Sequence, residues 1–300
     1  MPEKLNWVTS YEKGKYDLAV LHVDQQCLLE DLGKSKVFRQ IRKQITDIPI
    51  IVLNHGTPVY PERFILMAEE DGYKATEEAS IQWANDKMKE LLKGTEVMIV
   101  NSHEAQKQWG FGKVIIHGMD DKEWFDLKKE PRIVTCISPA GIGDKYYGRR
   151  MFSDTRAVLK EKYGIETVWI NDDVRFSDWD SYKNFLGKSL VYFNPTLGSP
   201  MPRSRTEAML SGCCVVTVDN QDANMFIKNG ENGFLVKANP EEAAKKLSEL
   251  IFNYKEALRI GQEGKKTAIE VFSSERFIKD WENLVKEVLA NYKNKHGQKK

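Results

Sequence analysis

The sequence predicts an α/β protein with two parallel-sheet domains. Apolar runs of strand length alternate with helical segments along most of the chain, as in a parallel sheet with crossover helices. The alternation occurs twice, and a polar segment at residues 121–131, ending in proline, separates the two halves. A chain of 300 residues, 41% of them hydrophobic, also exceeds what one core usually holds. We therefore expect two domains.

The first domain, residues 1–127, is predicted to form a small parallel sheet. Its most regular helix is expected at residues 76–93. Only about fifteen residues precede the strand that begins at Tyr16. Its strands are predicted at residues 5–10, 16–23, 48–56, 96–102 and 113–118.

The second domain, residues 128–272, repeats the alternation. Three helical stretches follow between about residues 240 and 290. The last segment, residues 273–300, is predicted to be an amphipathic helix and a basic tail. We interpret this tail as solvated, with contact to anionic lipid as the alternative. The strands of the second domain are predicted at residues 132–138, 166–172, 189–195, 213–219 and 233–238.

The segment from Ser199 to Val216 combines a polar loop, a short helix and a buried strand. The helix is expected at residues 206–211. In a parallel sheet, the loops at the carboxyl ends of the strands line the ligand site, and a helix amino terminus there favours an anion. Glu207 could accept two hydrogen bonds from vicinal hydroxyls, whereas Arg203 and Arg205 suit phosphate oxygens. This segment therefore predicts a site for a phosphorylated, hydroxyl-rich ligand.

A second loop, residues 138–150, leads from a strand into a helix and contains three glycines. Glycine allows the backbone to approach a phosphate closely, so Gly143 is a candidate contact. Lys145 and Arg149 are candidate phosphate ligands, with a solvated basic loop as the alternative. Asp178-Trp179-Asp180 matches a metal-binding Asp-x-Asp pattern, but we interpret it as a helix cap.

Composition narrows the classes of function. Residues 1–127 hold 16 basic and 21 acidic side chains, whereas residues 128–300 hold 29 and 23, so the second domain is the one that favours an anion. This distribution argues against a broad nucleic-acid interface on the first domain. The four cysteines have neither a disulfide framework nor metal-ligand spacing. With no membrane-spanning run and no signal peptide, we expect a cytoplasmic protein.

Four stretches together resemble the retaining GT-B glycosyltransferases of family 4. Glu207-Ala208-Met209 matches the second Glu of the family signature, and Gly230 to Val236 (GENGFLV) matches its following turn and strand. Residues 97–120 resemble the family's strand, helix and closing strand. Residues 16–56 resemble the pair of strands that precedes them. The resemblance implies two Rossmann-like domains that face a central cleft, with the last helix crossing back to the first domain.

The resemblance also implies an activity. It implies transfer of a hexose from a UDP- or GDP-sugar to an acceptor hydroxyl with retention, without a metal or another cofactor. Ser199 stands where the family has its first Glu, and Pro200-Met201-Pro202 replaces the following Gly-Phe-Gly. The residues assigned to catalysis are His55, Ser199 and Arg203. Those assigned to the nucleotide sugar are Gly143, Lys145, Arg149, Met201, Arg205 and Glu207, with Glu207 on the ribose.

Two other functions stay open at this point. The first is a nucleotide- or sugar-binding GT-B module without transferase activity, such as a regulatory subunit, which the Ser at position 199 and the shortened first domain favour. The second is a transferase that acts on a polymer such as DNA or a cell-wall polymer. The acceptor, whether a glycan, a lipid-linked molecule or a polymer, is not indicated by the sequence.

Overall fold

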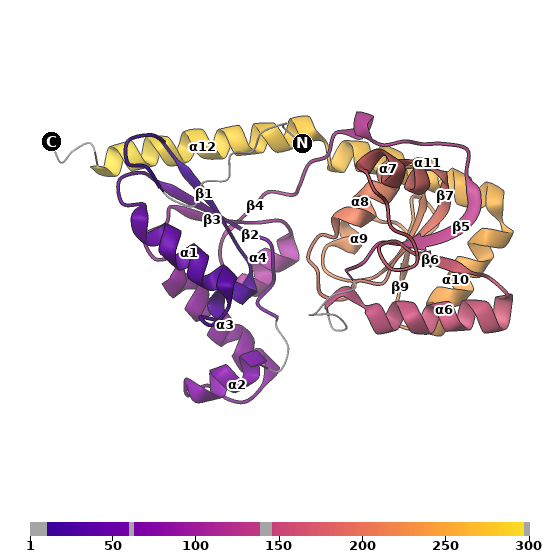
Figure 1. Ribbon diagram of the computed structural model, residues 1–300, viewed down its shortest axis with the longest axis horizontal. Helices are drawn as coiled ribbons and strands as arrows, with labels where there is room; N and C mark the ends of the chain where they lie inside the picture. Colours follow the sequence, from indigo (N-terminus) through magenta and orange to yellow (C-terminus); the bar gives the residue numbers. More distant parts are fainter. Residues whose placement is uncertain (1–10, 60–62, 139–145, 297–300) are drawn as a thin grey trace. The chain divides into compact units, whose positions relative to one another are not determined.

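The computed structural model describes residues 11–59, 63–138 and 146–296 (Figure 1). The chain divides into two compact units. Unit 1 comprises Met1–Ile115 and Lys279–Lys300, and unit 2 comprises Ile116–Ile278.

The sequence analysis began the second domain at residue 128. In the structure, unit 2 begins earlier, at Ile116. The polar segment after Ile116 is part of unit 2 because two of its side chains are anchored there. Trp124 is only 6% exposed and belongs to a core cluster of unit 2. Asp126 accepts hydrogen bonds from Gln262 and Lys265. The connector therefore folds with the second domain.

The described strands of unit 1 form a four-stranded parallel sheet in the order β1-β2-β3-β4. Its core combines aliphatic strand residues with side chains of the surrounding helices, including Phe64, Trp83 and Trp109. The strand predicted at residues 5–10 lies outside the described residues. The elements are β1 (Ala19–Val23), η1 (Gln25–Leu28), α1 (Gly33–Gln44), β2 (Ile50–Asn54), α2 (Arg63–Glu70), α3 (Glu77–Leu91), β3 (Val97–Val100), α4 (His103–Trp109) and β4 (Lys113–Val114).

Unit 2 contains a five-stranded parallel sheet in the order β6-β5-β7-β8-β9. Its last helix, α12 (Ser274–His296), begins in unit 2 and continues in unit 1 from Lys279. Its other elements are η2 (Asp121–Glu123), β5 (Glu130–Thr135), α6 (Arg149–Tyr163), β6 (Thr167–Trp169), α7 (Trp179–Lys188), β7 (Ser189–Asn194), α8 (Arg203–Leu210), β8 (Cys214–Val218), α9 (Ala223–Phe226), β9 (Phe234–Val236), α10 (Pro240–Phe252) and α11 (Tyr254–Val271).

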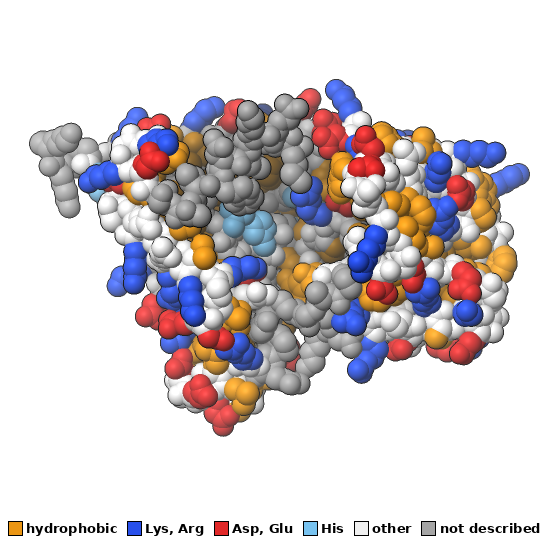
Figure 2. All heavy atoms as spheres, viewed as in Figure 1, with side chains coloured by type: hydrophobic (Ala, Val, Ile, Leu, Met, Phe, Trp, Pro, Cys, Tyr) orange, Lys and Arg blue, Asp and Glu red, His pale blue; other side chains and the backbone are white. Residues whose placement is uncertain are grey.

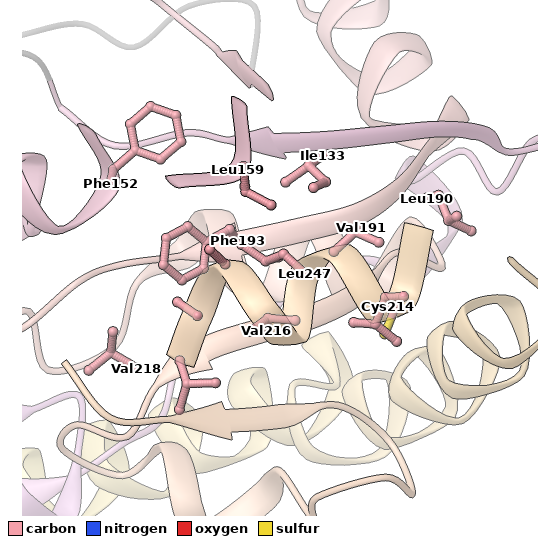
Figure 3. Packing of buried hydrophobic residues seen from close by; sticks show 14 of the residues in the cluster. Ile133, Phe152, Leu159, Leu190, Val191, Phe193, Cys214, Val216, Val218 and Leu247 are labelled. Carbon is pink, nitrogen blue, oxygen red and sulfur yellow. The ribbon is translucent and has the colours of Figure 1, made fainter. Parts of the chain in front are cut away.

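Both faces of the unit 2 sheet are buried. All six residues of β7 and all five of β8 are buried, as their uninterrupted apolar sequences require. Val191 and Phe193 face one core cluster, which includes residues of α6 and α10 (Figure 3). Tyr192, between them, faces the opposite cluster with Met209 of α8. These are the two layers of helices that a parallel α/β sheet needs.

Helix α8 begins at Arg203, three residues earlier than the sequence predicted. Pro202 occupies the cap position with φ −61°, a value that the proline ring imposes and that suits entry into a helix. The Asp-x-Asp segment was predicted correctly as a cap, because Asp178 Oδ1 accepts a 2.7 Å hydrogen bond from the Ser181 N–H at the start of α7.

Gly148, the cap of α6, is held close to the loop after β7. Its φ of 70° is left-handed, and a Cβ at this position would lie 1.9 Å from the carbonyl oxygen of Pro195. Gly164, at the other end of α6, has a similar φ of 67° but no atom within 4 Å of such a Cβ. The two glycines thus share a backbone conformation and differ in packing.

We predict that Gly148→Ala destabilises the protein more than Gly164→Ala. The left-handed conformation costs both variants about 1 to 2 kcal/mol. The clash with Pro195 adds about 1 to 3 kcal/mol for Gly148→Ala alone. Urea unfolding followed by circular dichroism measures the difference. Equal losses of stability in the two variants would contradict the close approach of these loops.

Candidate functional site

Two helix amino termini lie next to each other at the carboxyl edge of the unit 2 sheet. Helix α6 follows β5 and α8 follows β7, and these two strands are neighbours in the sheet. Their loops are in contact, because the backbone N–H groups of Leu197 and Gly198 donate to the carbonyl oxygen of Tyr146 at 3.1 and 2.9 Å. Each helix terminus presents free N–H groups and partial positive charge. The edge is therefore suited to an anion.

Glu207 lies one turn into α8 and is 7% exposed. Its Oε2 accepts a 2.6 Å hydrogen bond from the hydroxyl of Tyr182 on α7. Burial raises the pKa of the Glu207 carboxyl, whereas the Tyr182 hydrogen bond and the charge of Arg203 lower it. Among the hydrogen bonds of the described residues, Oε1 accepts none. The carboxylate thus has a fixed orientation and one oxygen left for a ligand.

Tyr182 is itself held rigidly. Its ring is 6% exposed and lies 5.0 Å from the Trp179 ring and 6.3 Å from the Trp124 ring, measured between centroids. Burial and the nearby Glu207 carboxylate raise the pKa of its hydroxyl well above the usual range. Tyr182 therefore keeps its proton and remains a donor to Glu207.

Arg149 and Arg203 are exposed cations at this edge. They are the first residues of α6 and α8, respectively, and both side chains are exposed. Ser199 lies in the loop before α8 and is partly exposed, whereas Met201 is buried. The structure therefore brings together Arg149, Ser199, Arg203 and Glu207. Gly143 and Lys145, predicted to join them, lie outside the described residues.

Arg205 does not occupy the place predicted for a phosphate ligand. Its side chain is 0% exposed, with the guanidinium 4.8 Å from the centroid of the Phe226 ring and Nη2 3.5 Å from the sulfur of Met201. Burial lowers the pKa of this guanidinium to about 10. A phosphate oxygen cannot reach it in this arrangement. Arg205 and Met201 instead help to pack α8 against α9.

His117 lies beside the same helix. Its Nε2 is 3.1 Å from the hydroxyl of Thr206, and its ring stacks on Phe272 at 5.0 Å between centroids. Burial, together with the charges of Arg203, Arg205 and Arg276, lowers the pKa of His117 to about 3. A neutral imidazole thus sits next to the cationic start of α8.

His55 belongs to unit 1, where it pairs with a second histidine. His22 is the last residue but one of β1 and His55 follows β2, and the atoms His22 Nδ1 and His55 Nε2 are 2.8 Å apart. The rings stack at 5.0 Å between centroids, and both side chains are exposed. Histidine side chains are visible at the surface in Figure 2. Burial lowers the pKa of both rings.

The structure contains neither a recognisable metal centre nor a membrane span in the part of the chain that it describes. No three His, Cys, Asp or Glu residues there are grouped in a way that could hold a metal ion. Likewise, none of the helices described has the length and apolar character needed to cross a bilayer.

The comparisons with known proteins agree with this architecture. Residues 154–267 match the family described as "Glycosyl transferases group 1". Among solved structures, HepE from Anabaena in complex with UDP-glucose is similar with a TM-score of 0.65 and 16% identity, covering 91% of this chain and 79% of HepE. A search of curated proteins gives no match.

Two further structures show the same fold. Sucrose-phosphate synthase from Thermosynechococcus elongatus has a TM-score of 0.66 and 16% identity, with 93% of this chain and 75% of the synthase covered. A glycosyltransferase from Rickettsia africae has a TM-score of 0.56 and 14% identity, with 92% and 100% covered. The chain thus resembles the group 1 glycosyltransferases, and its fold is GT-B with two Rossmann-like sheets. The fold expected from the sequence is confirmed.

The sequence analysis assigned no site role to Tyr182, His22 or His117. An aromatic residue inside an amphipathic helix is normally predicted to be a core residue. The hydrogen bond from Tyr182 to Glu207 joins α7 to α8, which are separate in the sequence. His22 could have been predicted from the position of two histidines near the ends of consecutive strands. Adjacent parallel strands bring their carboxyl ends together, so His22 and His55 could be expected to lie close to each other.

We predict that His117 makes stability fall as the pH falls below about 6.5. The unfolded chain binds a proton with a pKa of about 6.5, whereas the native pKa is about 3, so the native state binds fewer protons between these values. This difference lowers the unfolding free energy by up to about 1.4 kcal/mol per pH unit within that window and has no effect above it. Stability of the parent and His117→Gln, measured by urea unfolding from pH 4 to 8, tests this. If the unfolding free energy of the parent and of His117→Gln changed with pH at the same rate below pH 6, the prediction would be contradicted.

Proposed function

We propose that this protein transfers a hexose from a UDP- or GDP-sugar to an acceptor hydroxyl, with retention and without a metal. The observation that carries the proposal is the buried Glu207 carboxylate, oriented by Tyr182 one turn beyond an exposed, cationic helix terminus. Vicinal ribose hydroxyls suit the carboxylate, and the diphosphate suits the helix termini with Arg149 and Arg203. The match to group 1 glycosyl transferases and the UDP-glucose complex of HepE support it.

In this mechanism the bond between the anomeric carbon and the diphosphate oxygen breaks, and the acceptor oxygen bonds to that carbon on the same face. The departing phosphate oxygen takes the proton of the acceptor hydroxyl, so no separate base is needed. Arg149 and Arg203 neutralise the charge that develops on the diphosphate, and Lys145 is proposed to join them. His55 is proposed to contact the donor sugar.

A second candidate is a GT-B module that binds a nucleotide but does not transfer sugar. It is favoured by Ser199, which stands where a Glu is expected, and by Pro200 and Pro202, which lack the N–H groups that could hold a sugar or phosphate. Both prolines are buried, which leaves little freedom to rebuild these donors.

We predict that the parent releases nucleotide from at least one of UDP-glucose, UDP-N-acetylglucosamine and GDP-mannose when a mixed acceptor extract is present. Ser199→Glu should lower this rate at least tenfold, because an unpaired carboxylate would enter the arranged site. A coupled assay of free nucleotide measures both rates. If the parent binds UDP or GDP but releases none from any donor, the binding module replaces our proposal.

We also predict different ligand dependences for Glu207 and Arg203. Glu207→Gln should weaken binding of both uridine and UDP by about 1.5 to 3 kcal/mol, because the ribose contact is common to both, as tested by calorimetry. Arg203→Ala should weaken UDP binding but not uridine binding, and its effect should shrink in high salt.

The matched control is Lys160→Ala. Lys160 is an exposed cation near the carboxyl end of α6, where it pairs with Glu166 away from the helix amino terminus. This variant should bind both ligands like the parent. If guanosine and GDP are the ligands that bind the parent, the same contrasts apply to them. Loss of UDP and uridine affinity to the same degree in Arg203→Ala would remove Arg203 from the diphosphate site.

A further inference from the structure

Unit 1 contains an apolar pocket that the functions discussed above do not use. The pocket has a volume of about 290 Å³ and lies between β1 and α1. This size is near the lower end of the range for small-molecule sites. Its lining is formed by Leu21, His22, Gly33, Lys34, Val37, Phe38 and Ile41.

The exposed position of Val37 distinguishes this pocket from an ordinary gap in packing. Phe38 is 6% exposed and closes the pocket from the core side, whereas Val37 is 55% exposed. The neighbouring exposed positions of α1, Lys36 and Gln40, are polar, as expected for the solvent side of a helix. A β-branched apolar residue there is unfavourable for the helix, and more than half of its side chain gains no burial in the chain itself. A bound apolar group would supply that burial.

The opposite end of the pocket is polar because His22 belongs to its wall. His22 shares a hydrogen bond with His55, so in the neutral pair one ring nitrogen donates and the other accepts. Each ring then has one nitrogen left over, and these two are always one donor and one acceptor, whichever ring carries the shared proton. A hydroxyl group also donates one hydrogen bond and accepts others. The remaining nitrogen of His22 is either a donor or an acceptor, and a hydroxyl complements it in both tautomers.

The rim of the pocket is close to neutral overall. Lys34 is the cation in the lining, and its Nζ is 2.5 Å from Oδ2 of Asp24. Because the carboxylate offsets this charge, the rim gives little preference to a phosphate or carboxylate ligand. A neutral ligand is the better match.

We propose that this pocket binds a neutral amphipathic ligand, with an alkyl or aryl group against Val37 and Phe38 and a hydroxyl on the His22–His55 pair. A second step rests on the proposed function: in a glycosyltransferase, this ligand is the sugar acceptor, so the acceptor class is an alkyl- or aryl-substituted alcohol or glycoside. The apolar group determines affinity and the hydroxyl is the group presented for transfer.

The test uses octyl β-glucoside, below its micelle concentration, and methyl β-glucoside as probes of the full-length protein. Both present the same sugar hydroxyls, and they differ only in the apolar group. Calorimetry should show at least tenfold tighter binding of octyl β-glucoside. Val37→Asp should abolish this preference, since it places a charge in the pocket.

The matched control is Val20→Asp. Val20 lies on β1, is 40% exposed and is not part of the pocket lining, so this variant introduces the same charge on an exposed valine nearby. It should leave the preference intact. His22→Gln should weaken binding of both glucosides while retaining the preference for the octyl group. Equal affinity of the two probes, or equal losses in Val37→Asp and Val20→Asp, would overturn the proposal.

Binding and transfer are measured separately, so the two proposals fail in different ways. Val37-dependent binding of octyl β-glucoside, without transfer from any nucleotide sugar, would support the pocket and contradict its role as an acceptor site. Transfer to methyl β-glucoside that is as efficient as to octyl β-glucoside, and unchanged in Val37→Asp, would support the transferase and overturn the pocket.

Discussion

The candidate site depends on the burial of β7 on both faces. This strand lies between β5 and β8, and its six residues are buried, so its position is fixed by the sheet and by helices on either side. The Tyr192 hydroxyl, on one face of β7, donates to the Ser204 hydroxyl at 2.8 Å and thereby ties the first turn of α8 to the strand. Glu207 follows Ser204 by one turn. The direction of the carboxylate is thus set by the core rather than by the mobile surface of a loop.

Burial is the largest influence on the pKa values of the charged and titratable groups at this edge. Arg205 carries its charge in the interior without a carboxylate within ion-pair distance among the described residues, an expensive arrangement that a nearby aromatic ring offsets in part. Burial and the charges of Arg203, Arg205 and Arg276 together lower the pKa of the neighbouring His117 to about 3. Burial raises the pKa of Glu207, and the Tyr182 hydrogen bond and the charge of Arg203 offset part of that rise.

The sequence predicted the fold to a large extent because its information is local. The strands of both sheets are nearly continuous apolar runs, and the helix stops and caps, such as Gly212 and Asp178, act over three or four residues. The start of α8 was misplaced because Pro202 was treated as part of the loop, although its fixed φ also fits the cap position. The domain boundary was misplaced for a related reason, since a polar connector gives no local indication of the core that Trp124 enters.

The site was less predictable because it depends on contacts between elements distant in sequence. Arg205 resembles its neighbour Arg203 in sequence, and only the rotation of α8 against Phe226 determines that one is exposed and the other is buried.

The chemistry of the two units is complementary in kind. At the start of α8, unit 2 offers positive charge and a single oriented carboxylate, which under the proposed function favour a charged, hydroxyl-bearing nucleotide. Unit 1 offers a neutral pair of histidines next to an apolar pocket, which discriminates against charge and in favour of a hydroxyl. Lowered histidine pKa values contribute to this, because a protonated pair would present only donors and would repel a second cation nearby. A transfer between a charged donor and a neutral alcohol needs both kinds of surface.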